Sequence, residues 1–172
     1  EGYQSKLESM IKSENKDKVL HFDNLGVDEL YIDEAHEYKN LQFHTKQGGI
    51  SGINPKGSNK SYDLYMKCQY IQEQNKIKTG KNNKGVFFAT GTPISNSLAE
   101  LYTISRYLDG DSLQNKNISH FDEWCNVFAE VKEEWQVAST GNGFEKKKMF
   151  SNFRNIPELS KMYLQYGDIV LQ

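Results

Sequence analysis

The sequence predicts an α/β fold in which helices pack against a parallel sheet. Two short apolar runs, residues 30–32 and residues 85–89, have the length and composition of buried strands. The segment between them, residues 62–76, carries Leu64, Cys68 and Ile71 on one helical face. Because strands that alternate with helices form parallel sheets, we expect the two strands to belong to one parallel sheet flanked by helices.

Most of the remaining elements are expected to be helical. Apolar periodicity and capping residues predict further helices at residues 2–15, 97–108, 121–128 and from 156 onward. Residues 45–61 contain four glycines and indicate a surface loop, and residues 139–149 indicate a loop or hairpin tip. We therefore expect a mostly helical C-terminal extension over residues 111–172.

The composition is that of a globular domain. The chain has 172 residues, of which 37% are hydrophobic and 12% aromatic, so it can bury a core. Its net charge of -2 neither indicates nor excludes a nucleic-acid partner. Cys68 and Cys125 are far apart and predict reduced core thiols of a cytoplasmic protein. We find no signal-peptide pattern and no long apolar run, so no membrane partner is expected.

Polar residues follow both predicted strands. Asp33 and Glu34 come after the first strand, and Thr90, Gly91 and Thr92 come after the second. Ligands of parallel sheets bind beyond the carboxyl ends of the strands, so we expect both groups at one crevice. An aspartate in this place can hold Mg²⁺ through water, and a neighbouring glutamate can orient and deprotonate an attacking water.

The two strand-end segments resemble known motifs. LYIDEAHEYKNL, residues 30–41, is similar to motif II of Snf2-type superfamily 2 helicases, the Walker B box with the sequence DEAH. FATGTPISNSLAEL, residues 88–101, is similar to their motif III and the helix that follows it. The sequence around these motifs, most clearly over residues 22–108, resembles the large helicase and DNA-methyltransferase proteins of bacterial mobile elements and phages.

The resemblance implies a partial RecA-like lobe of a P-loop NTPase and a role for each motif residue. Asp33 would hold water-bound Mg²⁺, Glu34 would be the catalytic base, and His36 would couple the nucleotide site to motif III. Thr90, Gly91 and Thr92 would transmit the nucleotide state to the DNA. The candidate DNA contacts are Lys39, Asn40 and Asn96.

One motif of this family is missing from the sequence. The phosphate-binding loop Gly-x-x-x-x-Gly-Lys-[Ser/Thr], which would anchor the triphosphate, does not occur in the chain. We therefore expect residues 1–110 to be the second half of the first motor lobe and residues 111–172 to lead toward the second lobe. ATP and Mg²⁺ would bind a longer protein and not this fragment, which we expect to be inactive alone. Its partners would be DNA, the missing half-lobe and the second lobe, and a second copy could pair with the exposed sheet edge.

The sequence is also compatible with two other functions. The chain could be a non-catalytic interaction module that kept the lobe fold, or part of a nuclease or restriction subunit. The sequence upstream of Glu1 discriminates between the motor and the module, because a phosphate loop there favours the motor, whereas flanking nuclease motifs would indicate the nuclease or restriction subunit.

Several residue types allow both a functional and a structural interpretation. The lysines at 146–148 could follow DNA phosphates or lie on a solvated loop, and we favour the loop slightly. Aromatic residues such as Phe87, Trp124 and Trp135 are predicted to be core residues and not base-stacking platforms. His21, His44 and His120 are predicted at the surface or at helix caps, without metal.

Overall fold

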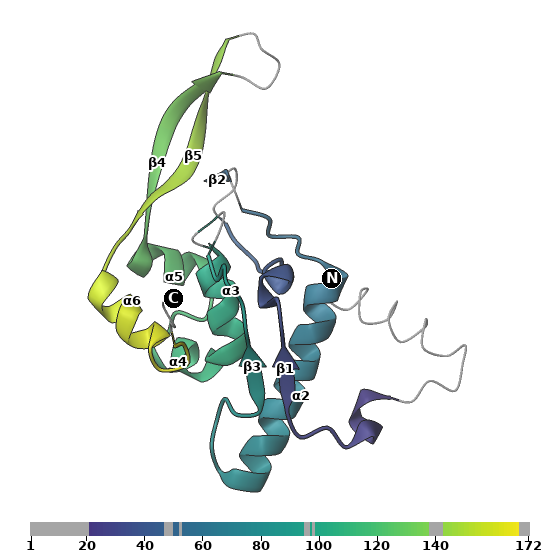
Figure 1. Ribbon diagram of the computed structural model, residues 1–172. Coiled ribbons are helices and arrows are strands. Elements are labelled where there is room, and N and C mark those ends of the chain that lie inside the picture. The colour runs from purple at the N-terminus through teal and green to yellow at the C-terminus, as the bar shows by residue number, and fades with distance from the viewer. Residues whose placement is uncertain are drawn as a thin grey trace.

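The structure is a computed structural model, and it describes residues 21–46, 50–51, 53–94, 97, 99–137 and 143–168. The helix predicted over residues 2–15 lies outside these residues. Figure 1 shows a body of helices around a small sheet, from which a long hairpin projects. In chain order the elements are 3-10 helix η1 (Phe22–Leu25), β1 (Leu30–Ile32), 3-10 helix η2 (Ala35–Tyr38), β2 (Ile50–Ser51), α2 (Asn59–Thr79), β3 (Val86–Phe88), α3 (Ala99–Leu108), α4 (Gly110–Asn115), α5 (Phe121–Phe128), β4 (Ala129–Val137), β5 (Phe144–Phe153) and α6 (Ile156–Tyr163).

Strands β1 and β3 pair in parallel and confirm the predicted parallel sheet, which in the described residues has these two strands (Figure 1). Leu30 lies opposite Val86, and Ile32 lies opposite Phe88. Gly85 enters β3 at φ +89°, and a Cβ there would lie 2.3 Å from the Asn75 side chain. Glycine is therefore needed where the chain turns into this strand.

Helix α2 is fixed at both ends by its capping residues. The Ser58 hydroxyl accepts a hydrogen bond from the Ser61 amide at 3.2 Å, so the helix begins three residues earlier than its apolar pattern predicts. At the other end Gly80 adopts φ 69°, and its amide donates to the Lys76 carbonyl. The helix thus spans the connection between β1 and β3.

Two clusters of buried side chains form the core, and α3 contributes to both. The sheet core lies between α2, α3 and the sheet, and it consists of Leu41, Leu64, Cys68, Ile71, Val86 and Tyr107. The helix core lies among α3, α4, α5 and α6, and its largest buried members are Tyr102, Leu113, Phe121, Trp124 and Phe128. Tyr107 of α3 belongs to the first cluster and Tyr102 to the second, so α3 joins the sheet to the C-terminal helices.

Both cysteines are free, buried thiols, one in each core. Burial raises the pKa of Cys68 and the pKa of Cys125 to about 12. Their environment therefore keeps them protonated and unreactive, as the prediction of core thiols requires.

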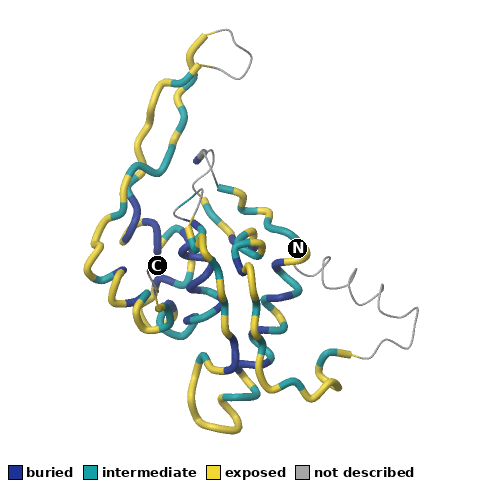
Figure 2. The backbone as a smooth tube through the Cα atoms, in the orientation of Figure 1, coloured by how far each residue is buried: buried dark blue, intermediate teal, exposed yellow. Residues whose placement is uncertain are grey.

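The C-terminal part of the chain is less helical than the sequence predicts. Of the residues predicted as a loop or hairpin tip, Phe144 to Met149 form part of β5, which pairs with β4 in an antiparallel hairpin, and β2 adds to the outer edge of β5. Figure 2 shows that most of this hairpin is exposed or half-buried. Trp135 is 66% exposed and Phe87 is 47% exposed, so their prediction as core residues is wrong, whereas Trp124 is fully buried as predicted.

Within the described residues, no helix combines the length and the apolar composition needed to cross a membrane.

Candidate functional site

The candidate site lies where β1 and β3 end. Beyond the last paired residues, the Ala89 amide donates to the Ile32 carbonyl at 2.9 Å, and the Ala35 amide donates to the Ala89 carbonyl at 3.0 Å. These bonds hold the segment after β1 against the segment after β3. Residues that are 54 positions apart in the sequence, His36 and Thr90, therefore meet at the same rim of the sheet.

Four of the predicted site residues are linked side by side at this rim. The His36 ring nitrogen Nδ1 lies 3.0 Å from the Glu34 carboxylate and 3.4 Å from the Thr90 hydroxyl. The Thr90 hydroxyl oxygen in turn accepts a hydrogen bond from the Thr92 amide at 3.1 Å. One imidazole thus contacts both the carboxylate that follows β1 and the turn that follows β3.

The backbone at Glu34 adopts an unfavourable conformation. Its φ of 51° and ψ of 44° lie in the left-handed region, where a side chain with a Cβ is disfavoured. The other non-glycine residues with positive φ in the described part of the chain are all asparagines, which tolerate this region better. A glutamate in such a conformation is the kind of backbone strain that clusters at functional sites.

Asp33 is exposed at the same rim and can serve a hard cation. Its Oδ1 accepts a hydrogen bond from the Glu34 amide at 2.9 Å, which orients the carboxylate. No group of three or more His, Cys, Asp or Glu side chains in the described residues could hold a metal by itself. A single strand-end carboxylate fits Mg²⁺ held mostly by water and phosphate oxygens, and does not fit a closed protein metal site.

A cavity of about 520 Å³ adjoins the threonine turn. Its walls come from Ala35, from Thr90 and Gly91, and from the segment after α6 that includes Tyr166 and Asp168. Asp33 and Glu34 are not among its lining residues and lie on the exposed rim beside it. The structure therefore places the carboxylates next to the cavity and not inside it.

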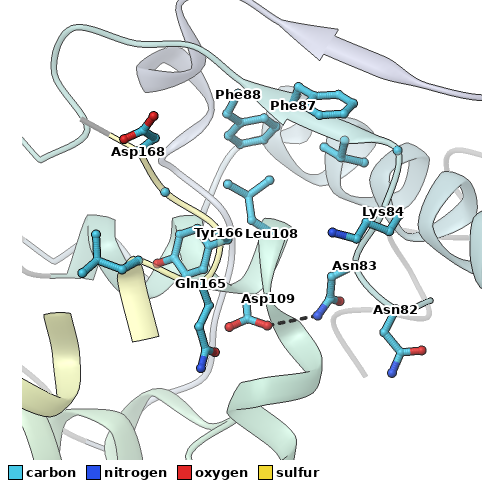
Figure 3. Close-up of a pocket in the computed structure, with 14 residues that line it drawn as sticks. Asn82, Asn83, Lys84, Phe87, Phe88, Leu108, Asp109, Gln165, Tyr166 and Asp168 are labelled. Atoms are coloured by element: carbon cyan, nitrogen blue, oxygen red, sulfur yellow. Dashed lines mark hydrogen bonds between the residues drawn. The ribbon is translucent and has the colours of Figure 1, made fainter. Parts of the chain in front are cut away.

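A second cavity, of about 600 Å³, runs along the outer edge of β3 (Figure 3). It lies between the strand and the segment Leu164 to Asp168. Asp109 lines the cavity, and its Oδ1 accepts a hydrogen bond from the Asn83 side chain. Burial raises the pKa of the Asp109 carboxyl. The Oδ2 atom of Asp109 is buried with no hydrogen-bond partner. This cavity borders the side of β3 that faces away from β1.

The predicted DNA contacts occupy different environments. Lys39 forms a buried ion pair with Glu100 of α3 at 3.1 Å, and the two side chains are only 7% and 12% exposed. A phosphate contact by Lys39 would require this pair to open. Asn40 is exposed, and its backbone carbonyl accepts a hydrogen bond from the Ser58 amide. Asn96 lies outside the described residues.

Sequence reasoning gave no role to Arg106, which the structure shows to be an organising residue. Its guanidinium donates to the Gln42 carbonyl at 2.6 Å and lies over the rings of Tyr65 and Tyr102. Arg106 therefore ties the segment after the DEAH residues to α2 and α3. Its position on a helix gave no signal of these long-range partners.

Comparison with known proteins identifies the family of this chain. Residues 2–170 match a protein family described as "Probable helicase domain". The chain belongs to this helicase-domain family. The chain is also similar to "Defense against restriction protein B" of Escherichia phage P1, with 22% identity over 154 residues. That match covers 88% of this chain but only 6% of the phage protein. No solved structure matches this helicase domain.

Replacing Glu34 tests the backbone strain in the helicase domain. We expect Glu34→Gly to be more stable than Glu34→Ala by about 1 kcal/mol, because glycine alone escapes the Cβ penalty at positive φ. At an ordinary position glycine is the less favourable of the two. Urea unfolding of the two variants gives the difference, and a more stable alanine variant would show that Glu34 is not held in the left-handed region.

Lys39 and Glu100 provide a test of the link between the two motifs. We expect Lys39→Met to cost about 3 kcal/mol of unfolding free energy, because it removes a positive charge that lies 3.1 Å from the largely buried carboxylate of Glu100. Adding Glu100→Met should recover most of that loss. Lys78→Met is the matched control, since Lys78 pairs with Asp28 on the surface, and should cost under about 1 kcal/mol. Equal losses in the two single variants would contradict the buried pair.

Proposed function

We propose that this helicase domain is part of an ATP-dependent DNA helicase or translocase of the Snf2-like group of superfamily 2. The observation that carries the proposal is the contact of His36 with both Glu34 and Thr90. A motor needs its hydrolysis site coupled to the element that contacts its track, and this contact joins the carboxylate to the threonine turn. The Asp-Glu-Ala-His and Thr-Gly-Thr-Pro sequences, in this order, support the same proposal.

In this proposal each residue at the rim has one task. Asp33 holds Mg²⁺ through water, and the ion neutralises charge on the triphosphate when both are bound. Glu34 accepts hydrogen bonds from the attacking water and takes its proton. His36 senses the state of Glu34, and Thr90 and Thr92 carry that change into the segment before α3. Gly91, between the two threonines, lines the 520 Å³ cavity.

The fold class proposed here is a partial RecA-like lobe of a P-loop NTPase. The parallel pair β1 and β3, with α2 as the connection, supports this class. Tyr31 and Phe87 stack 4.6 Å apart, and both are exposed. An apolar pair of this kind suits a sheet that another segment covers in a complete lobe.

The proposed partners follow from the same geometry. In a parallel pair, the amide and carbonyl groups of successive residues point alternately toward and away from the partner strand. Those of Val86 and Phe88 point away from β1, toward the 600 Å³ cavity. We propose that a strand from the half-lobe carrying the phosphate loop pairs there. Without that half-lobe the chain would not hydrolyse ATP, and a second copy could occupy the same edge. A fused DNA methyltransferase, as in the proteins that the sequence resembles, belongs to the proposal for a longer protein.

The proposal is tested in a longer protein that contains this chain and a phosphate loop. We expect Glu34→Gln to lower its DNA-stimulated ATPase activity by at least about 100-fold, the size of a general-base contribution. Glu37→Gln is the matched control: Glu37 is a nearby exposed carboxylate that pairs with Lys60, and its loss should leave the rate close to that of the wild type.

A wild-type rate in Glu34→Gln would end the assignment of Glu34 as the base. The absence of any phosphate loop in the gene upstream of Glu1 would favour the alternative, a non-catalytic interaction module.

A further inference from the structure

The hairpin of β4 and β5 is an arm that is anchored at its base, and its described residues beyond the base are mostly exposed or half-buried (Figures 1 and 2). At the base, Phe150 and Phe153 pack against the helix core, and the Arg154 amide donates to the Phe128 carbonyl at 2.7 Å. Strand β2 pairs with β5 at Lys148 and Met149. Beyond this level the described hairpin residues pair with one another, from Glu133 opposite Lys148 to Val137 opposite Phe144.

The two faces of the arm differ sharply in chemistry. Cross-strand partners share a face, and successive residues alternate between faces. The aromatic face therefore consists of Glu133, Trp135, Val137, Phe144, Lys146 and Lys148. The opposite face consists of Lys132, Glu134, Gln136, Glu145, Lys147 and Met149. The first face has two lysines and one glutamate, whereas the second has two of each and no aromatic ring.

The large apolar side chains of the aromatic face are exposed. Trp135 is 66% exposed, and Phe144 is 72% exposed. The Lys146 ammonium lies 5.3 Å from the centre of the Trp135 ring, while Lys148 and Glu133 form a loose surface pair at 3.9 Å. Such a pair contributes little to stability, so Lys148 can exchange it for another anion. Exposed aromatic surface of this size, placed on an arm, indicates a binding partner.

We propose that the aromatic face of the arm binds single-stranded DNA. Unpaired bases would stack on Trp135 and Phe144, and the phosphates beside them would contact Lys146 and Lys148. Stacking favours unpaired bases, because a duplex hides the faces of its bases in its own stack. The choice of DNA over other polymers rests on the proposed function, whereas the stacking chemistry rests on the arm alone.

The tryptophans of the chain make the arm directly observable. The chain has two tryptophans, of which Trp124 is fully buried and Trp135 is exposed. A ligand that binds from solution therefore quenches the fluorescence of Trp135 and not that of Trp124. We expect an oligo(dT) strand to quench this fluorescence in the 172-residue chain, and Trp135→Phe to abolish the quenching. A DNA duplex of the same length and at the same concentration should quench the Trp135 fluorescence much less.

The binding strength is tested by anisotropy of a labelled oligo(dT) strand. We expect Trp135→Ala to weaken binding by about tenfold or more, because one stacking contact is lost. The double variant Lys146→Glu, Lys148→Glu should weaken binding. It should also reduce the slope of log K against log salt concentration by about 1.4, the value for two phosphate contacts. The matched control is Lys132→Glu with Lys147→Glu, which makes the same charge change on the opposite face. Circular dichroism of each variant checks that it is folded.

The outcomes separate this proposal from the proposed function. Weaker binding in the aromatic-face variants, with little change in the opposite-face variant, supports the arm even if Glu34→Gln leaves the ATPase rate unchanged. Equal losses in the two charge variants, or binding without quenching of Trp135, would overturn the arm while leaving the motor proposal intact. Self-association of the chain that Trp135→Ala abolishes, without DNA binding, would also overturn it and assign the face to protein contacts.

Discussion

The pairing of β1 with β3 is the constraint on which the rest of the site depends. These strands are only three residues long, yet their parallel register sets where the two polar segments emerge. Two further backbone bonds, from Ala89 to Ile32 and from Ala35 to Ala89, carry that pairing past the ends of the strands. The side-chain contacts of His36 follow from this backbone arrangement and not from any attraction between histidine and threonine.

Helix α3 transmits this arrangement to the remainder of the molecule. Glu100 at its start pairs with Lys39, while Arg106 and Tyr107 near its end donate hydrogen bonds to the carbonyls of Gln42 and Tyr38. The segment after the DEAH residues is thereby attached to the helix after the threonine turn at three levels. A displacement of either strand end would move α3, and α3 is shared by the two cores. The same helix therefore supplies stability and a physical route between the rim and the C-terminal helices that carry the arm.

Local patterns were enough to predict the two strands, their parallel arrangement, α2 and the position of the segments after both strands at one rim of the sheet. They failed where distant contacts decide the outcome. Trp135 has the same neighbours in sequence whether it is buried or exposed, and only the register of β4 with β5 places it beside Lys146 on an outer face. The burial of Lys39 depends on Glu100, which is 61 residues away. The left-handed backbone of Glu34 had no sequence signal, because glutamate rarely adopts it.

The central claim is that the rim formed by the two strand ends brings the imidazole of His36 to Thr90. Nuclear Overhauser spectroscopy of the isotope-labelled chain measures this proximity in solution most directly. The account predicts cross-peaks between the imidazole protons of His36 and the side chain of Thr90, together with amide contacts between Ala35 and Ala89. An imidazole with no cross-peaks to Thr90, in a chain whose β1 and β3 amides show no mutual contacts, would contradict it.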